Sequence, residues 1–389
     1  MSLEFDGANN KISNSSGASY GVALPAPNYR QPQPLIINGN MAVAQRSTSV
    51  ASITASGYNT LDRYRCVIVT AGTWTQSQDT DVPTGSGFAT SMKWDCTTAD
   101  ASLGASDLIT IQQFVEGQNV QYLKKGTSDA VPITLSFWVK SVLTGTYICE
   151  IGDSDNSRSI SQAYTISDAS TWEYKTLNFP GDTTGAFTND NGASLTVQFC
   201  LGAGTDYTSG SLATSWGTTT TANRYVGQVN LANSTSNNFW ITGVQLEVGE
   251  FNSTTLPPFQ HESYGDNLER CQRYYEKSFL IGTTPAASAV APDGNIFSSW
   301  DTNTARMYIN FKKRKRANPT ITVYRGNNAG SGTATGTANF IYSGAWNNHT
   351  CTGSVSQDYG ASLTASSTAN FGTDSGVVAD LNWTLDAEL

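Results

Sequence analysis

The 389-residue sequence contains little of what most enzymes and membrane proteins need. It has only two histidines, His261 and His349, which lie in different regions. A histidine-based triad or zinc site needs histidine beside matched partners, and neither residue has them. The sequence has no nucleophile elbow, P-loop or HExxH motif. No apolar run approaches the ~18 residues of a membrane span. We therefore expect a protein that is not an enzyme, uses no cofactor and does not insert into a membrane.

Charge is also scarce, at 14% of residues, and the balance is acidic. Lys and Arg number 22 and Asp and Glu number 31, so the net charge is 22 − 31 = −9. An acidic surface repels phosphate backbones, so nucleic acid is not an expected partner. One run, 312–316 (KKRKR), is strongly basic. No aromatic residue interleaves its charges, so we interpret it as a solvated strand end.

The six cysteines form no CxxC pair, and the N-terminus has neither a basic start nor an apolar run. Three of the cysteines, Cys66, Cys149 and Cys200, lie within apolar segments (RCVIV, YICEI and VQFCL). We expect buried thiols in a protein made in a reducing cytoplasm, without a signal peptide.

Gly, Ser, Thr, Asn and aromatic residues replace the missing charge. Aromatics reach 11%, and the 35 glycines supply turns between short apolar segments. This composition predicts an all-β protein. About ten strand signals between residues 36 and 250 predict a jelly-roll β-sandwich. The predicted core comprises Phe137, Trp138, Val139, Trp172, Val197, Phe199, Trp240 and Val244.

The order of signals predicts four segments. Residues 1–35, rich in proline, predict an extended attachment arm in which 3–5 could form one strand. Residues 36–255 are the sandwich, 256–278 a Pro turn and a connector helix, and 279–389 a small distal β-domain.

The connector helix, predicted over 262–277, carries one narrow apolar stripe. Leu268, Cys271 and Tyr275 fall at i, i+3 and i+7. A stripe this short cannot stand alone in water. It is expected to face a trimer axis or, failing that, to dock the helix on its own sandwich.

Three local patterns resemble a known family. They are 36–46 (IINGNMAVAQR) with Tyr58 and 62–64 (DRY); 240–249 (WITGVQLEVG) with 258–259 and 271–275 (CQRYY); and 315–324 (KRANPTITVY). This order is similar to that of the fibre and decoration proteins of tailed bacteriophages. Read as residues alone, the motifs are mostly structural. Asn38-Gly39 suits a turn, and Asp62 and Arg63 could form a buried ion pair.

The resemblance implies a carbohydrate-binding-like β-sandwich in a homotrimeric virion protein, assembled in the host bacterial cytoplasm. It also implies that residues 1–35 attach to other virion proteins of the head or tail. Host-surface polysaccharide is the further partner it implies. The alternatives are a capsid decoration or scaffolding protein with no ligand, and a polysaccharide-binding module or glycosidase.

Candidate functional residues are few. Trp216 and Trp346 lie among Ser, Thr and Asn, so each could offer a sugar an apolar face with polar groups beside it; the alternative for each is a loop plug. The carboxylates considered for a glycosidase, Asp79, Asp81, Asp153, Asp155 and Asp182, all lie in turn-like segments. The segment 153–156 suggests a calcium loop but lacks the glycine and distal glutamate of an EF-hand, so we predict no metal site, with a structural Ca²⁺ between sandwich loops as the alternative.

Overall fold

The computed structural model describes residues 3–6, 11–14, 19–21, 34–286, 295–326, 336–342, 345–366, 371 and 377–389. The chain divides into two units, Met1–Pro34 and Leu35–Leu389. The first unit contains a three-stranded antiparallel sheet of β1 (Leu3–Asp6), β2 (Lys11–Asn14) and β3 (Ser19–Gly21). The strand predicted at 3–5 is β1, whereas β2 and β3 were not predicted.

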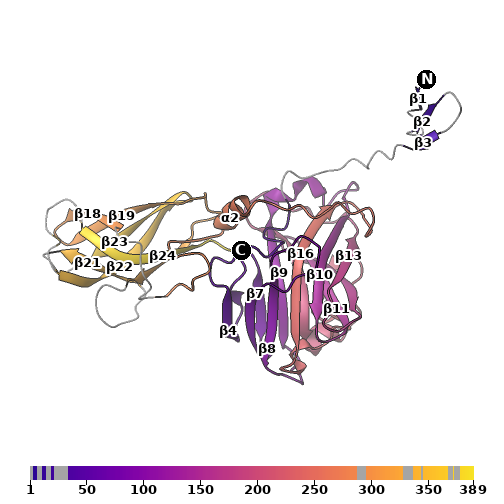
Figure 1. Cartoon of the computed structure of the whole chain (residues 1–389), viewed down its shortest axis with the longest axis horizontal. Coiled ribbons are helices and arrows are strands. Elements are labelled where there is room, and N and C mark those ends of the chain that lie inside the picture. The colour runs from indigo at the N-terminus through magenta and orange to yellow at the C-terminus, as the bar shows by residue number, and fades with distance from the viewer. Residues whose placement is uncertain are drawn as a thin grey trace. The chain divides into compact units, whose positions relative to one another are not determined.

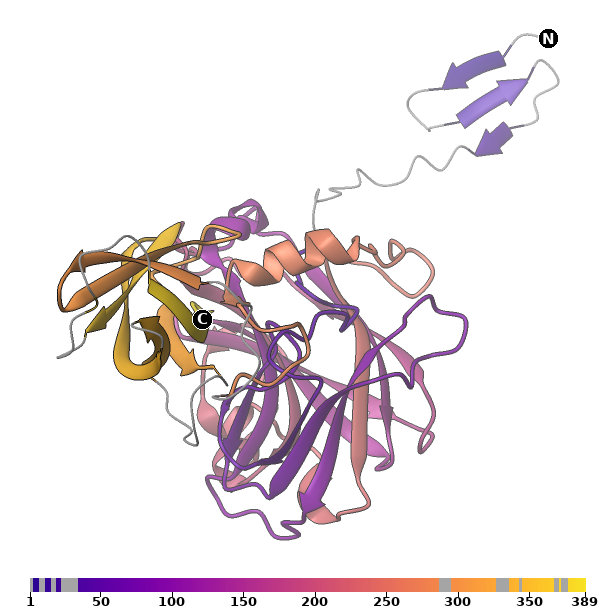
Figure 2. The same cartoon turned by 60° about the vertical axis from the view of Figure 1, so that its left-hand side comes forward.

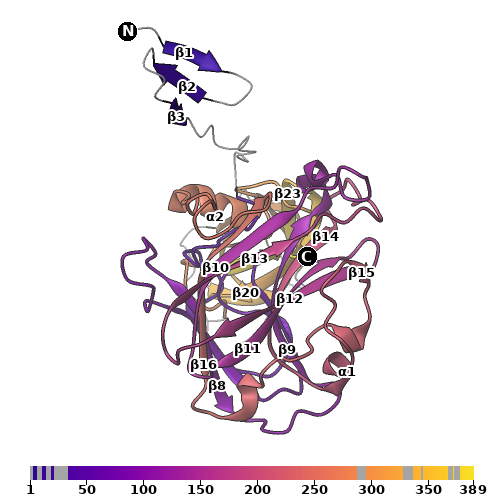
Figure 3. The ribbon, with the colours of Figure 1, turned by 90° about the vertical axis from the view of Figure 1, so that its right-hand side faces the viewer.

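Most of the second unit is a β-sandwich, as the sequence predicts (Figures 1 and 3). Its six-stranded sheet has the order β13 (Glu173–Phe179), β10 (Ile133–Ser141), β16 (Asn238–Val248), β8 (Ser91–Thr98), β7 (Thr73–Asp79) and β4 (Ser49–Ile53). Its seven-stranded sheet has the order β15 (Gly217–Thr218), β12 (Arg158–Ile166), β11 (Gly145–Asp153), β14 (Ala193–Ala203), β9 (Leu108–Glu116), β6 (Arg65–Val69) and β5 (Gly57–Tyr58). All the described pairings in these two sheets are antiparallel.

The core of the sandwich follows the two-residue period of its strands. On β10, Ile133, Leu135, Phe137 and Val139 point into the common core, so Thr134, Ser136, Trp138 and Lys140 lie on the outer face. Five residues predicted for the core lie there: Phe137, Val139, Val197, Phe199 and Val244. The prediction was wrong for Trp138, Trp172 and Trp240, which are only half-buried and lie outside it.

A β-bulge explains the misplaced Trp240. Opposite β10, the register runs from Ser136↔Gln245 to Trp138↔Thr242, so one extra residue of β16 is inserted at Gly243. Gly243 has a φ of 62°, which glycine adopts at little cost. Val244 points into the core, and the bulge moves Trp240, of the same parity in sequence, to the opposite face.

Residues 35–45 (LIINGNMAVAQ), one of the segments whose apolar pattern predicts a strand, form a turn instead. Asn38 and Met41 have positive φ values of 60° and 57°, and the Asn38 side chain exchanges hydrogen bonds with Val43 N and O (2.9 and 2.8 Å). The turn predicted at Asn38-Gly39 is present, and Gly39 O accepts a bond from Val244 N at the bulge (2.9 Å). This turn therefore lies directly on β16.

The C-terminal part is a small barrel with its own core. Its strands are β17 (Tyr275–Lys277), β18 (Asn295–Asp301), β19 (Thr304–Asn310), β20 (Thr320–Arg325), β21 (Thr337–Tyr342), β22 (Ala345–Gln357), β23 (Gly360–Ser366) and β24 (Val377–Asp386). The pairings β24–β18–β19–β23–β22–β21 return to β24, so six strands close on themselves. Small and aromatic side chains, including Ala305, Ala365, Phe297 and Phe340, share the core. The apolar segment 278–282 (SFLIG), which by itself predicts a strand, follows β17 and forms none, whereas the sequence patterns did not predict β18, β22 and β23.

The connector helix α2 (Tyr264–Gln272) lies across one end of the sandwich (Figure 2). Ser263 caps it by accepting a hydrogen bond from Asp266 N. The helix is shorter than the predicted 262–277, because the chain turns after Gln272 and Tyr275 begins β17. The remaining helical segments are α1 (Thr205–Thr208) and the 3₁₀ turns η1 (Gly117–Asn119), η2 (Gln121–Leu123), η3 (Thr221–Asn223) and η4 (Leu231–Asn233). Within the described ranges, no helix has the length and apolar character needed to cross a membrane.

All six cysteines are buried and unpaired, as the sequence predicts. Burial raises the pKa of the Cys96 thiol to about 11 and that of the Cys351 thiol to about 12, so both remain protonated at neutral pH.

Candidate functional site

The outer face of the six-stranded sheet carries aromatic and charged side chains in rows across the strands. The register aligns Lys140 of β10 with Trp240 of β16, and Trp240 with Lys93 of β8. Trp172 lies immediately before β13, next to the Lys140 end of β10. We call these residues, together with Trp138 and Tyr174, the aromatic face.

The first row alternates tryptophan with lysine. The Lys140 ammonium lies 4.3 Å from the centre of the Trp240 ring and 5.4 Å from that of Trp172. The Lys93 ammonium lies 5.3 Å from the Trp240 ring. Contacts of this kind attract a cation to the negative face of the ring and fix both side chains. The row is therefore ordered before any ligand arrives.

Two carboxylates from the end of β7 orient the indoles. Asp81 forms an ion pair with Lys140 and accepts a hydrogen bond from Trp172 Nε1 (2.9 Å). Asp79 accepts one from Trp240 Nε1 (3.3 Å). Partial burial acts to raise the pKa of Asp81, but its bonds to Lys140 and Trp172 outweigh that effect and lower the pKa below its usual value. Asp81 is thus a carboxylate at neutral pH.

The second row is more open. Trp138 lies opposite Tyr174 of β13 on one side and Thr242 of β16 on the other. The centres of the Trp138 and Tyr174 rings lie 5.1 Å apart, and the ring planes meet at 46°. Tyr174 is 38% exposed. Because Tyr174 is exposed at one edge of this pair, the pair offers a ligand a flat apolar surface.

Further rings extend this surface beyond the bulge. A Cβ at Gly243 would lie 2.6 Å from the Phe88 ring and 3.2 Å from the Trp138 indole, so both rings pack over the glycine. The centre of the Phe88 ring lies 5.0 Å from that of Phe259 and 5.3 Å from that of His261. Aromatic side chains thus follow one another from Trp172 to His261.

The residues singled out for glycan binding lie elsewhere. Trp216 is half-buried and packs against the sandwich core, and its Nε1 donates to Pro180 O (2.7 Å). This placement matches the loop plug left open as its alternative. Trp346 belongs to β22, but its side chain is outside the described residues.

The predicted helix stripe is used within the chain. Cys271 is fully buried with Ile37 and Val43 of the sandwich, and half-buried Leu268 packs beside them. Tyr275 is not on the helix; it lies in β17, with the Arg46 guanidinium 3.7 Å from its ring centre. These contacts dock α2 on its own sandwich, and whether a trimer axis also passes here stays a prediction.

In the segment suggested as a calcium loop, the ammonium group of Lys125 lies where a metal ion would bind. The Lys125 ammonium lies 2.5 Å from Asp153 Oδ2 and 3.0 Å from Asp182 Oδ2. It also donates to Thr184 O (2.9 Å) and Gly185 O (2.8 Å). Four oxygens therefore surround one buried positive charge. Asp153 and Asp182, considered above as catalytic carboxylates, have this structural contact.

The basic run was interpreted wrongly in part. Lys313 and Arg314 are exposed, but Lys315 is buried and forms an ion pair with Glu276 (2.6 Å). Arg316 donates to Ala387 O (2.9 Å) and Glu388 O (3.0 Å). The run thus holds the barrel, α2 and the end of the chain together.

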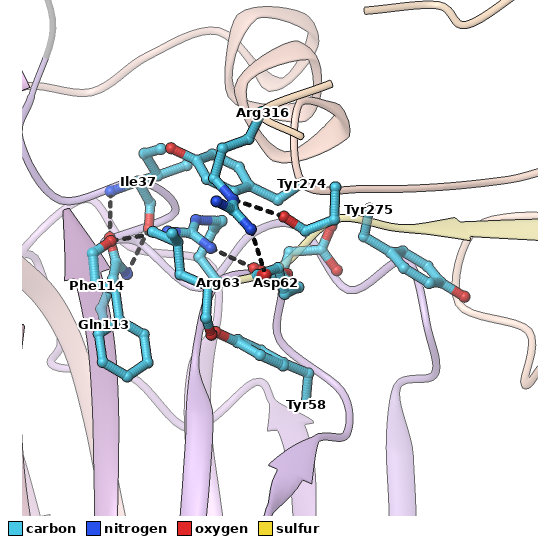
Figure 4. A network of polar contacts seen from close by, with 12 residues as sticks. Ile37, Tyr58, Asp62, Arg63, Gln113, Phe114, Tyr274, Tyr275 and Arg316 are labelled. Atoms are coloured by element: carbon cyan, nitrogen blue, oxygen red, sulfur yellow. Dashed lines mark hydrogen bonds and ion pairs between the residues drawn. The ribbon is translucent and has the colours of Figure 1, made fainter. Parts of the chain in front are cut away.

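Asp62 and Arg63 do not pair with each other as expected; each contacts other residues. Arg63 is fully buried, pairs with Glu388, donates to Phe114 O (2.8 Å) and lies 3.4 Å from the Tyr274 ring centre (Figure 4). Asp62 instead accepts from Gln45 and lies 4.0 Å from Arg46. Gln113 fixes the neighbouring Ile37 backbone through bonds of 2.7 and 3.0 Å (Figure 4). These motif residues therefore join the sandwich to the barrel.

Comparison with known proteins shows distant structural similarity only. No family model matches the sequence, and no curated protein matches it. A structure of the enzymatically active domain of tailspike protein 4 from bacteriophage CBA120 is 14% identical, with a TM-score of 0.29, over 55% of this chain and 21% of that one. A CBM4 structure is 12% identical (TM-score 0.28), over 54% of this chain and 97% of that one. TmCBM61, solved with β-1,4-galactotriose, is 11% identical (TM-score 0.26), over 56% of this chain and 99% of that one.

Proposed function

We propose that this protein is a non-enzymatic, glycan-binding virion protein of the phage fibre or decoration type, and that its sandwich binds saccharides on the aromatic face. The aromatic face itself carries the proposal. It places three indoles, a phenol, two ammonium groups and two carboxylates on one side of a sheet. The virion assignment rests on the family resemblance of the sequence.

The chemistry of the face suits a sugar. A pyranose presents a patch of C–H groups on one side and hydroxyls around its edge. The Trp138–Tyr174 pair would contact the C–H patch, because large aromatic faces bury much apolar area at little entropic cost. Asp81, whose side chain is 44% exposed, and the half-buried Lys93 are the nearby groups that would bond hydroxyls.

The same contacts favour binding over hydrolysis. A glycosidase needs two carboxyl groups, one of which is a proton donor with a raised pKa. Asp81 has a lowered pKa and is held by Lys140 and Trp172, and Asp79 is bonded to Trp240. This supports an interpretation of both carboxylates as groups that position indoles.

A glycan array of bacterial surface polysaccharides tests the proposal. The full chain is compared with Trp138→Ala, Trp240→Ala and, as a matched control, Tyr308→Ala; Tyr308 is an aromatic residue on the barrel that is 50% exposed. We expect Trp138→Ala and Trp240→Ala each to weaken binding at least tenfold, about 1.4 kcal/mol. Tyr308→Ala should bind like the unmodified chain.

If no polysaccharide binds, or if Trp138→Ala binds as well as the unmodified chain, the aromatic face is not a glycan site. The scaffolding alternative would then be favoured, and the virion assignment would depend on particle incorporation alone.

A further inference from the structure

A second candidate site lies where the barrel meets the sandwich. A cleft of about 480 Å³ opens between residues 46–59 of the sandwich and strands β17, β20 and β24 of the barrel. This volume falls within the ~300–1,000 Å³ of small-ligand sites. The aromatic face is formed by other residues, so this cleft does not depend on the function proposed above.

The barrel wall of the cleft is a row of hydroxyl groups. Alternate residues of β20, Thr320, Thr322 and Tyr324, all line the cleft, because side chains two apart share one face of a strand. On β24, Asp386 lies opposite Thr320, and Thr384 lies opposite Thr322. Hydroxyls that both donate and accept hydrogen bonds are thus spaced along two paired strands.

The sandwich wall contributes a fixed cation and aromatic rings. Arg46 lies 3.7 Å from the Tyr275 ring centre and 5.2 Å from that of Tyr58, and it forms an ion pair with Asp386 (3.1 Å). Tyr58 donates its hydroxyl proton to Leu389 O (2.9 Å). These contacts hold the wall in one arrangement without a ligand.

The charge in the cleft is balanced. Among the described residues that line it, Arg46 and Asp386 are the only ones charged at neutral pH, and they pair with each other. The Asp386 side chain is still 44% exposed, so its oxygens remain accessible to further donors. Arg46 is buried and also pairs with Glu388 (3.4 Å), so a charged ligand would have to break these contacts, whereas a neutral polyhydroxyl ligand could bond to Asp386 without breaking them.

We propose that this cleft binds a short neutral saccharide that bridges the two domains. Ring hydroxyls would donate to Asp386 and exchange bonds with Thr320 and Thr322, and the Tyr324 ring would contact the sugar's C–H face. Because the ligand would touch both domains, binding should also stabilise their junction against unfolding.

Titration calorimetry of the full chain with six probes tests this site: methyl glycosides of glucose, galactose and N-acetylglucosamine, and the trisaccharides maltotriose, cellotriose and β-1,4-galactotriose. Thr322→Val removes one hydroxyl at constant volume, and Tyr324→Phe removes another. Tyr308→Ala, which alters an exposed aromatic residue of the barrel outside the cleft, is the matched control, and Trp138→Ala reports on binding at the aromatic face.

At least one probe should bind, and Thr322→Val should weaken it about tenfold or more, with a smaller loss for Tyr324→Phe. Tyr308→Ala should leave this binding unchanged. The proposal is overturned if none of the six probes binds, or if the affinity of every bound probe is insensitive to both cleft variants. Sensitivity to Trp138→Ala alone would assign the sugar to the aromatic face and would also overturn the cleft site.

Discussion

A single glycine decides which tryptophans are available to a ligand. The sequence predicts the strand over 239–249, and alternation alone assigns Trp240 to the same face as Val244. The bulge at Gly243 reverses that phase, and neither composition nor periodicity locates a bulge of one residue. The aromatic face was therefore missed, although the strands that carry it, β8, β10, β13 and β16, lie in the region between residues 36 and 250 where strand signals were predicted.

Substitution of this glycine should damage both stability and binding. For Gly243→Ala we expect a loss of ~1–3 kcal/mol in the free energy of unfolding, because φ is 62° and the new Cβ would press on Phe88 and Trp138. Urea unfolding measures this loss. Gly217→Ala is the matched control, since a Cβ at Gly217 meets nothing within 4 Å. Equal stability of the two variants would contradict a strained bulge.

The Lys125 ammonium is buried between Asp153 and Asp182. The sequence of 153–156 did not reveal this contact, because Lys125 is distant from that segment in the sequence. Lys125→Ala leaves Asp153, Asp182 and two carbonyl oxygens around an empty position. Removing one partner of a buried ion pair costs ~3–5 kcal/mol. Oxygen ligands of this kind suit Ca²⁺.

We therefore expect Ca²⁺ to raise the Tm of Lys125→Ala and to leave that of the unmodified chain unchanged. Calorimetric scans with and without Ca²⁺ measure both. Lys175→Ala, which removes a lysine paired with Glu173 on the same sandwich, should show neither the large loss nor the rescue. A Lys125→Ala variant as stable as Lys175→Ala would mean that the four-oxygen contact contributes little.

At the scale of elements, the basic run is divided between surface and junction. Lys315 is buried against Glu276 and donates to Gln272 O (2.5 Å), whereas Lys313 pairs with Glu269 in solvent. Lys315→Met should lower the free energy of unfolding by ~3–5 kcal/mol, because it leaves Glu276 buried without its partner. Lys313→Met, two residues away, should change it by less than ~1 kcal/mol. Chemical denaturation of both variants measures the two changes in the free energy of unfolding. Changes of similar size would support the original interpretation of the run as a solvated strand end.

Glu116 links the end of β9 to the segment after α2, and this contact should weaken in acid. Its carboxylate accepts bonds from Arg273 (2.7 Å) and Tyr274 (2.5 Å). Burial acts to raise its pKa, but these bonds outweigh burial and lower the pKa from 4.5. A lowered pKa in the folded state means that Glu116 contributes stability above about pH 4.5, and that this contribution is lost as the pH falls through the lower folded pKa.

The measurement is the Tm of the unmodified chain and of Glu116→Gln between pH 6 and pH 3. The difference in Tm between the two should be largest at pH 6 and should shrink below about pH 4.5. Asp62, whose pKa burial raises to about 6, changes both proteins alike and cancels from the comparison. A difference that is constant with pH would show that Glu116 is not ionised in the contact.

At the scale of the whole molecule, strand patterns are local, so the sequence predicted an all-β chain and a β-sandwich, both of which are confirmed, and a division into segments that stays a prediction. It did not predict the closed barrel. Closure depends on β24 pairing with both β18, through Val377–Ala379, and β21, through the overlapping residues Val378–Asp380, and such pairings leave no local signal. The junction was missed for the same reason: Arg63 and Glu388 are 325 positions apart.

Oligomeric state is the remaining prediction at this scale, and the barrel supplies its physical argument. Since Cys271 is already buried against the sandwich, an assembly would have to cover other apolar surface. Ile296 of β18 is 64% exposed and lies opposite Val378 of β24, which is 39% exposed. Exposed apolar patches of this kind mark association sites.

We expect mass photometry of the full chain to give a trimer, at three times 41.5 kDa. Ile296→Asp should dissociate it, because the new carboxylate would be buried without a partner, whereas Asn303→Asp, which adds the same charge in the exposed β18–β19 turn, should not. A monomer for the unmodified chain would remove the trimer from the proposed function, and a trimer indifferent to Ile296→Asp would place the contact on another surface.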